Sequence, residues 1–232
     1  MIGDVVVVQI ENQSDSFAAG IDTRTGETRW RLDRPRAPNW TSPVLLPGKE
    51  GEQDLVLLQS STSLTAHDPA TGKQVWEHQV SCGGIPSATV AGDVIFVPAA
   101  GLTALKRDAS SQATQALWSE NKLGPSSASP VAHSDKVYVL DRGGVLTCGD
   151  AKDGKVLWAM RLGGTFWATP IIAGVHLYAA NQDGVVKVVK LGEKGEIVSE
   201  NDFGEGILAS PAASDGALYI RSDAHLWKIA GE

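Results

Sequence analysis

The sequence predicts an all-β protein, a β-propeller of about six four-stranded antiparallel blades in which the first and last blades are incomplete. The first observation behind this prediction is a tryptophan that follows an Asp–Gly turn and returns at a regular interval. Trp30, Trp76, Trp118 and Trp158 are separated by 46, 42 and 40 residues. A period of about 40 to 45 residues is typical of propeller blades.

A second mark recurs in the same register as the tryptophans. It is a tripeptide with serine or threonine in the middle, and its last residue returns after 45, 42, 40 and 41 residues. The five copies are Thr41–Pro43, Pro86–Ala88, Ala128–Pro130, Ala168–Pro170 and Ala209–Pro211. Since two unrelated marks share one period, we interpret the chain as an array of repeats that forms a single domain.

Between these marks, short apolar runs are long enough for strands and too short for helices. We expect no helix, and count 22 strands, with three in the first blade, four in each of the next four and three in the last. The expected blades cover residues 5–33, 43–78, 87–120, 129–162, 169–200 and 210–230. Residues 107–115 form a polar insertion, which we expect to be an exposed loop.

The turn before each tryptophan has its own chemistry. Asp22, Asp68 and Asp150 can accept hydrogen bonds from backbone amides just ahead of them, and a glycine four residues later can close the hairpin in the left-handed conformation. We therefore expect these carboxylates to form turns and not to act as catalytic groups.

The two end blades leave two arrangements open. The first blade lacks its innermost strand and the last lacks its outermost, and three strands plus three overshoot one four-stranded blade. The favoured interpretation is the C-terminal part of a longer propeller, of seven or eight blades, whose true N-terminus would donate the last strand. The alternative is a six-bladed ring with two three-stranded blades.

Composition excludes several classes of protein. The chain has 232 residues with 42% hydrophobic content, and no apolar run approaches the roughly 20 residues needed to span a bilayer. A net charge of −7, without a run of basic residues, argues against a general nucleic-acid or anionic-membrane surface. The first residues lack the features of a secretory signal, so either the chain is cytoplasmic or the numbering begins after the signal.

The cysteines and histidines do not form a recognisable site. Cys148 occupies a small strand position and is expected to be a packed free thiol, and a bridge to Cys82 is not expected, because the two lie in different parts of their repeats. The five histidines have no ligand spacing, and we expect each to be a partly exposed strand residue.

The repeated pattern Ala-x-Asp-x-x-Thr-Gly-x-x-x-Trp resembles the blade motif of the pyrroloquinoline-quinone-like (PQQ-like) propeller family. Ala66, Asp68, Thr71, Gly72 and Trp76 match every position, and the resemblance extends over essentially the whole chain. It implies that the tryptophan packs on a turn of the neighbouring blade. This structural docking role is expected for Trp30, Trp76, Trp118 and Trp158.

Some relatives in this family are quinone-dependent dehydrogenases that bind the quinone and Ca²⁺, in some members beside a disulfide between adjacent cysteines. This chain has no adjacent cysteines, and Asn181 and Asp183 fit a hairpin turn better than a calcium shell. We expect no catalytic residue, no metal ligand and no cofactor. PQQ and calcium are the cofactors that the resemblance would imply.

The best candidates for a binding surface are two tryptophans outside the docking motif. Trp40 and Trp167 each stand three residues before the proline of the second mark, in the loop that leads into a blade. Exposed aromatics beside arginine and amide side chains suit a protein, peptide or sugar partner. The other candidates are Arg36, Asn39, Arg142, Phe166, Asn181 and Gln182. The alternative is that both rings plug the channel between blades.

The expected function is a non-enzymatic binding or scaffold propeller for a protein, peptide or carbohydrate, with no nucleic acid and no membrane insertion. The rival interpretation is a fragment of a quinone-dependent dehydrogenase. A third is an extracytoplasmic sensor domain linked to a serine/threonine kinase. The resemblance implies a bacterial protein of the periplasm or a secreted one, and its open end blades could pair between chains.

Overall fold

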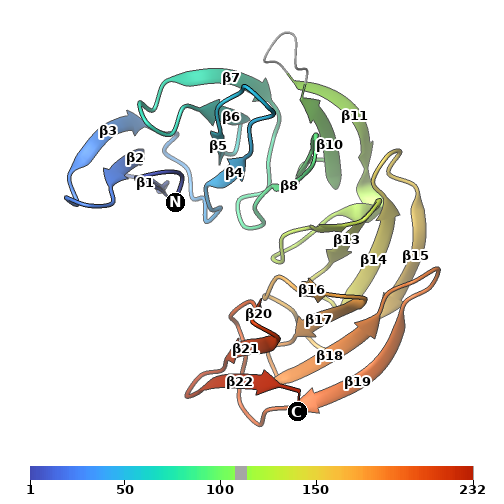
Figure 1. The fold of residues 1–232 in the computed structure, drawn as a ribbon. Coiled ribbons are helices and arrows are strands. Elements are labelled where there is room, and N and C mark those ends of the chain that lie inside the picture. The colour runs from blue at the N-terminus through green and yellow to red at the C-terminus, as the bar shows by residue number, and fades with distance from the viewer. Residues whose placement is uncertain (108–113, 232) are drawn as a thin grey trace. The chain divides into compact units, whose positions relative to one another are not determined.

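The computed structural model describes residues 1–107 and 114–231, which fold into 22 strands in six antiparallel sheets (Figure 1). The predicted all-β propeller fold is confirmed. One 3₁₀ turn, η1 (Asn121–Leu123), is the exception to the expected absence of helices. In the described ranges, no helix is long and apolar enough to cross a membrane. Most of the predicted loop at residues 107–115 lies outside the described residues.

The chain divides into two compact units, residues 1–119 and 120–232. The first unit holds one three-stranded and two four-stranded sheets, each in chain order from first strand to last. They are β1 (Val5–Ile10), β2 (Phe17–Asp22) and β3 (Thr28–Asp33); β4 (Val44–Leu46), β5 (Leu55–Gln59), β6 (Ser63–His67) and β7 (Gln74–Gln79); and β8 (Thr89–Ala91), β9 (Val94–Val97), β10 (Leu102–Arg107) and β11 (Thr114–Glu120).

The second unit follows the same plan with two four-stranded sheets and one of three strands. They are β12 (Val131–His133), β13 (Lys136–Leu140), β14 (Val145–Asp150) and β15 (Val156–Arg161); β16 (Ile171–Ala173), β17 (His176–Ala180), β18 (Val185–Lys190) and β19 (Glu196–Asp202); and β20 (Ala212–Ser214), β21 (Ala217–Arg221) and β22 (Leu226–Ala230). The first strands of neighbouring four-stranded sheets contact one another within a unit, β4 with β8 and β12 with β16, and β16 contacts β20 in the same way.

The Asp–Gly turns connect the last two strands of a sheet. Asp22 Oδ1 accepts hydrogen bonds from the amides of Arg24 and Thr25, and Gly26 has a φ of +73°. Arg29 also bonds Asp22, and this contact holds the pKa of the carboxyl well below its ordinary value. The same turn recurs at Asp68 and Asp150, whose side chains each accept a hydrogen bond from the amide two residues ahead. The residue four positions ahead again has a positive φ, a conformation that favours glycine.

The tryptophan of the last strand lies opposite a small residue of the strand before it. The pairs are Gly20 with Trp30, Ala66 with Trp76 and Cys148 with Trp158, and each lies beside a register shift. Small residues there leave room for the indole ring to lean toward the next sheet. Trp118 contacts the Phe96 ring, with the centroids 5.9 Å apart.

Trp30 shows what this arrangement does. Its Nε1 donates a 2.8 Å hydrogen bond to the carbonyl of Pro69, in the turn of the next sheet. A Cβ on Gly72 in that turn would lie 2.7 Å from the ring, so the turn sits directly on the indole. A Cβ on Gly195, in the turn after β18, would lie 2.9 Å from the Trp158 ring. The ring therefore joins one sheet to the next.

The second sequence mark also joins sheets, through its hydroxyl. The amide of Ser42 donates to Ser87 Oγ, the amide of Ser129 to Thr169 Oγ1, and the amide of Thr169 to Ser210 Oγ, each at 2.9 Å. Within each unit, the middle residues of consecutive tripeptides thus link the loop before one sheet to the loop before the next.

The core consists of apolar side chains between neighbouring sheets. One cluster contains Leu57, Leu64, Ile95 and Val97, from the second and third sheets. In the second unit the matching cluster lies between the sheets β12–β15 and β16–β19. Apolar burial on both faces explains why second strands such as β5 and β9 read as continuous hydrophobic runs.

Both cysteines are buried free thiols. Burial raises the pKa of Cys82 to about 12 and that of Cys148 to about 11. His67 differs from the expectation of partial exposure, because it is buried with Nδ1 2.9 Å from the Gly72 carbonyl and Nε2 2.9 Å from Thr65 Oγ1. Burial lowers the pKa of His67, so its ring is neutral near pH 7.

Candidate functional site

In the first unit, the loop that leads into β4 carries the most exposed aromatic of the predicted set. Trp40 is 70% exposed, and its backbone amide donates a 2.8 Å hydrogen bond to the carbonyl of Gly84, in the loop that leads into β8. Arg36, four residues earlier, is also exposed. Trp40 is therefore a surface residue, held at its backbone by the neighbouring loop.

In the second unit, three of the predicted residues come together from different loops. The guanidinium carbon of Arg142, in the β13–β14 turn, lies 4.6 Å from the centroid of the Trp167 ring. The amide of Gln182, in the β17–β18 turn, donates to the carbonyl of Thr165. Trp167 is half-buried, and its Nε1 is buried without a hydrogen-bond partner. A stacked arginine covers one face of this ring.

Two of the predicted surface residues are buried instead. Phe166 is fully buried in the apolar cluster between β12–β15 and β16–β19, whereas the adjacent Trp167 is half-buried. Asn181 is 4% exposed, and its Oδ1 accepts a 2.8 Å hydrogen bond from the amide of Val185 to close the β17–β18 turn. Neither side chain is available to a partner.

The loops that lead into the other sheets show how general the pattern is. At the offset of Trp40, the third sheet has Ile85, which is 37% exposed, and the last sheet has Leu208, which is 58% exposed. Ser127, at the same offset in the fourth sheet, is buried. Each unit therefore presents apolar side chains from two consecutive loops, Trp40 with Ile85 and Trp167 with Leu208.

A buried ionic cluster lies beneath the Trp40 loop. The side chain of Glu11 is fully buried, and it accepts hydrogen bonds from Arg34 Nε at 2.7 Å and from Asn39 Nδ2 at 2.8 Å. Arg34 Nη1 donates to Thr65 Oγ1. Asn39 Nδ2 also donates to the carbonyl of Gln59, at 2.7 Å. The candidate partner-binding residue Asn39 is thus engaged inward.

This cluster fixes the backbone on both sides of Trp40. Asn39 Oδ1 accepts from the amide of Thr41, and the Asn39 amide donates to the Glu11 carbonyl. Sequence patterns did not reveal it, because a glutamate after one strand and an arginine after another resemble solvated loop residues. One signal in the sequence could have indicated this cluster. The loops at Glu11 and Arg34 are rich in polar residues, although the neighbouring strands are apolar.

Asn181 and Asp183, the residues that the sequence offers as calcium ligands, have different surroundings in the structure. In residues 1–107 and 114–231, no three or more His, Cys, Asp or Glu side chains lie close enough to hold a metal ion. Asn181 uses its oxygen in the hairpin, and the neighbouring Asp183 is exposed. These two side chains therefore offer no convergent set of oxygen ligands.

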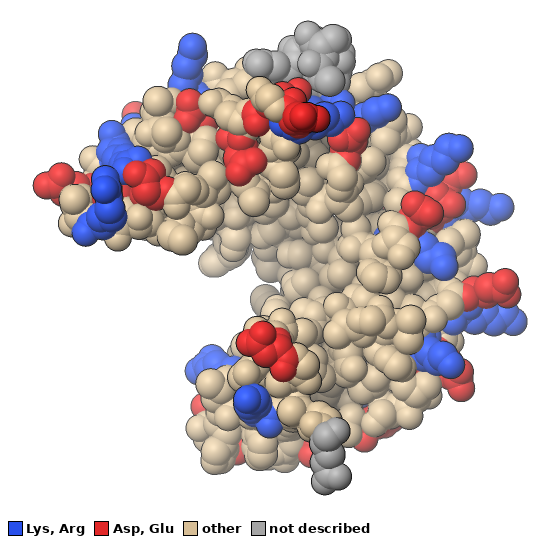
Figure 2. Space-filling view, in the orientation of Figure 1, with Lys and Arg blue, Asp and Glu red and all other residues tan. Residues whose placement is uncertain are grey.

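Charge is distributed without a dominant patch on the face that Figure 2 shows. Lys and Arg side chains stand among Asp and Glu side chains in both units. Several are paired, such as Arg31 with Asp15 and Lys49 with Asp93. Such a surface favours contacts with defined apolar and stacked groups over general attraction to a polyanion.

The comparisons with known proteins agree with the fold. A sequence profile described as outer membrane protein assembly factor BamB matches residues 2–96 and 100–191. The chain is similar to the crystal structure of BamB from Moraxella catarrhalis, with a TM-score of 0.76 and 20% identity over 96% of this chain and 68% of that one. No curated protein sequence matches the chain.

A second similar structure is an enzyme. The quinohemoprotein alcohol dehydrogenase from Comamonas testosteroni has a TM-score of 0.64 and 15% identity over 88% of this chain and 42% of that one. At these identities, the two likenesses show the fold alone.

Proposed function

Because the chain belongs to the family of the outer membrane protein assembly factor BamB, we propose that it is a non-enzymatic binding module for a protein or peptide partner. The observation that carries the proposal is Trp40, a 70% exposed indole on a loop held by buried hydrogen bonds. The resemblance to the PQQ-like repeat family is confirmed by the same match, and the two similar structures share the fold.

The apolar loop residues have the character of binding hot spots. Tryptophan and arginine are enriched among the interface residues that contribute most of the binding free energy. A loop whose conformation is already fixed loses little conformational entropy on binding. Trp40 with Ile85, and Trp167 stacked under Arg142, supply both residue types. A protein or peptide segment with exposed apolar side chains fits this chemistry, and a carbohydrate that stacks on the rings is the second candidate.

The family name places its members in outer-membrane protein assembly. We therefore propose a location outside the cytoplasm, with a partner among the proteins handled there. The mixed surface charge on the visible face supports a protein partner and gives no support to nucleic acid.

The proposed surface is tested with phage-displayed random peptides selected on the chain. The selected peptides should bind Trp40→Ala at least about tenfold more weakly than wild type, because truncating an aromatic hot spot costs at least ~2 kcal/mol. The combined Trp40→Ala/Trp167→Ala variant should bind none of them. The matched control is Val175→Ala, another exposed apolar residue, outside these loops. Equal affinity for wild type and Trp40→Ala would contradict the proposal, as would unfolding of the double variant.

We also propose that this function requires neither PQQ nor calcium. Titration of the chain with PQQ in the presence and absence of Ca²⁺ should leave its tryptophan fluorescence without a saturable change, because the described residues offer no convergent ligand set. Saturable, calcium-dependent quenching would instead favour a fragment of a quinone-dependent dehydrogenase.

A further inference from the structure

A buried histidine of the first unit has a hydrogen-bond partner at each ring nitrogen. His67, at the end of β6, is 3% exposed. Its Nδ1 lies 2.9 Å from the carbonyl oxygen of Gly72, which can only accept, so Nδ1 carries a proton. Its Nε2 lies 2.9 Å from Thr65 Oγ1. In the neutral ring Nε2 is therefore an acceptor, and the Thr65 hydroxyl donates to it.

The Thr65 hydroxyl can point in two directions. Its Oγ1 also lies 3.1 Å from the carbonyl oxygen of Leu58, and it accepts a 3.2 Å hydrogen bond from Arg34 Nη1. A hydroxyl has one proton to donate and two lone pairs that accept. When Nε2 of His67 also carries a proton, that N–H donates to Oγ1, and the hydroxyl donates to Leu58. Both protonation states of the ring thus satisfy its two nitrogens, and the ring proton decides where the hydroxyl points.

The surroundings of His67 oppose the second ring proton. Burial is the main reason that the pKa of His67 lies below its ordinary value of 6.5, and the charge of Arg34 acts in the same direction. The hydrogen bond to Gly72 and the charge of Glu77, on β7, act in the opposite direction. Arg34 approaches from the loop after β3, with a side chain that is 6% exposed. Protonation would therefore place two positive charges on one hydroxyl in a buried site.

The sign of the resulting pH dependence follows from this lowered pKa. The unfolded chain takes up the proton as the pH falls through 6.5, whereas the folded protein takes it up only at lower pH. The contribution of the neutral ring to stability is therefore complete above that value and is lost as the pH falls below it.

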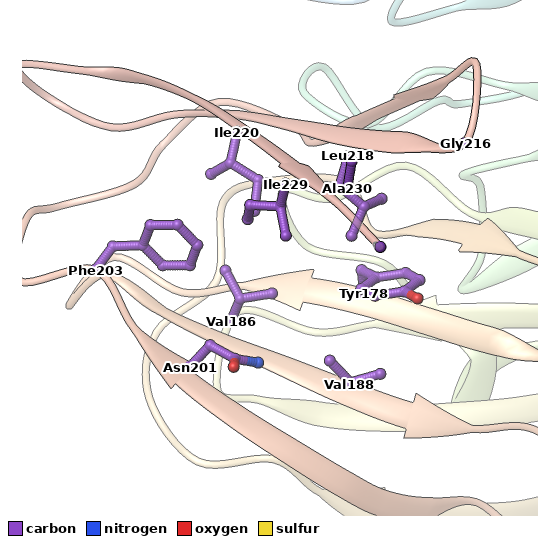
Figure 3. A pocket seen from close by; sticks show the side chains of 11 residues that line it. Tyr178, Val186, Val188, Asn201, Phe203, Gly216, Leu218, Ile220, Ile229 and Ala230 are labelled. Atoms are coloured by element: carbon purple, nitrogen blue, oxygen red, sulfur yellow. The ribbon is translucent and has the colours of Figure 1, made fainter.

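A cavity beside the ring offers Arg34 a second position. It has a volume of about 320 Å³, and the charged residues Asp33 and Lys73 line it together with His67 and Arg34. The cavity of about 450 Å³ in the second unit is different, because Figure 3 shows apolar side chains, a tyrosine and one amide around it. Nη2 of Arg34 is buried without a hydrogen-bond partner among the described residues. A guanidinium that turned into the polar cavity would be hydrated there.

Arg34 also connects the histidine to the Trp40 loop. Its Nε donates to Glu11 at 2.7 Å, Glu11 accepts from Asn39 Nδ2 at 2.8 Å, and Asn39 directly precedes Trp40. A positive charge on His67 repels Arg34 across the hydroxyl that both contact. Once Arg34 leaves this position, Glu11 loses its counter-charge, and the hydrogen bonds that hold the loop weaken with it.

We propose that the second ring proton of His67 displaces Arg34 and frees the Trp40 loop, so that the loop binds its partner in neutral solution and releases it in mildly acidic solution. The two directions of the Thr65 hydroxyl are the two states of this switch, and the proton selects between them. The inference rests on the proposed binding function, but the loop itself can be followed without a partner.

The first test measures amide hydrogen exchange by NMR at about pH 7.5 and about pH 5, on either side of the ordinary titration range of histidine. The amide of Trp40 donates to Gly84, and that of Thr41 donates to Asn39 Oδ1. Their protection factors, which are corrected for the intrinsic pH dependence of exchange, should fall at least about tenfold at the lower pH, the equivalent of one pKa unit. The amide of Gln182, in the second unit, should keep its protection. Unchanged protection of Trp40 and Thr41 would overturn the proposal.

Two histidine variants assign the effect to one ring. His67→Asn keeps an N–H that can donate to the Gly72 carbonyl and does not titrate, so the fall in protection should disappear. His78, the other histidine of the first unit, lies with Nδ1 2.9 Å from Thr114 Oγ1 and also has a pKa lowered by burial. His78→Asn is the matched control and should leave the fall in place. A fall that persists in His67→Asn would overturn the proposal.

A variant at the surface tests the same ring without touching the buried network. Glu77 is exposed, and its charge favours the protonated state of His67. Glu77→Gln should therefore move the midpoint of the protection change to lower pH by about 0.3 unit, as for a weak surface interaction. Glu27→Gln, which removes an exposed carboxylate from another turn, should leave the midpoint where it is. A midpoint that Glu77→Gln leaves unchanged or raises would contradict the role of His67, even if His67→Asn failed to fold.

The last test joins the switch to binding. Selected peptides that lack Asp, Glu and His should bind wild type at least about tenfold more weakly at about pH 5 than at about pH 7.5, and should bind His67→Asn equally at both. Binding that ignores pH while exchange follows it would overturn the link between the ring and the partner. If no peptide binds the Trp40 surface at any pH, the proposed function fails, and the exchange measurements still decide whether the proton frees the loop.

Discussion

Replacing Glu11 by leucine is expected to lower the free energy of unfolding of the first unit by about 3–5 kcal/mol. The Glu11 side chain is fully buried and accepts hydrogen bonds from Arg34 Nε and Asn39 Nδ2. Leucine removes the carboxylate and leaves the arginine, whose side chain is only 6% exposed, without its counter-charge. Urea unfolding followed by circular dichroism measures the loss.

Two control variants distinguish the loss of a buried charge from the loss of an exposed ion pair. Asp15→Leu breaks the ion pair with Arg31, in which both side chains are exposed, and should cost less than about 1 kcal/mol. The double variant Glu11→Leu/Arg34→Met removes both buried charges and should recover most of the loss, because apolar residues of similar size often replace a buried pair at little cost. A Glu11→Leu variant no less stable than Asp15→Leu would contradict the buried network.

The network also connects stability to binding. Asn39, which Glu11 holds, directly precedes Trp40 and accepts from the amide of Thr41. Release of Asn39 would let the loop sample other conformations, and a partner would then bear the cost of ordering it. The same buried charges that make the first unit sensitive to substitution therefore support the proposed binding surface.

The repeat could be predicted from the sequence because its marks are local. An aspartate that caps a turn, a glycine with positive φ and a tryptophan a few residues later each have a physical reason to stand at a fixed distance, as Asp22, Gly26 and Trp30 do. The hydroxyl of the second mark was visible as a repeat as well. Its role was not, since the bond from Ser42 to Ser87 joins residues 45 positions apart.

The site was harder to predict because neighbouring residues in a loop differ in burial. Phe166 and Trp167 are adjacent aromatics in one loop, yet one is fully buried and the other lies under Arg142. Asn181 resembles an exposed turn residue, but its side chain closes the turn from inside. Which of two adjacent side chains faces the core depends on tertiary packing, and no local pattern records it.

Replacing Trp30 by alanine is expected to lower the free energy of unfolding by about 3–5 kcal/mol, as for other buried tryptophans. The ring is buried, donates to the Pro69 carbonyl and is covered by the turn at Gly72. Alanine would therefore leave a cavity between the first two sheets and an unpaired carbonyl in the second. Urea unfolding monitored by circular dichroism gives the difference.

Trp40→Ala is the matched control, because it removes the same side chain from a position that is 70% exposed. Its effect should stay within about 0.5 kcal/mol, as for most surface substitutions. The two tryptophans thus separate the two roles: one joins sheets and is needed for folding, and the other is free to contact a partner. Equal losses in both variants would show that Trp40 also belongs to the core, and the proposed binding surface would have to be abandoned.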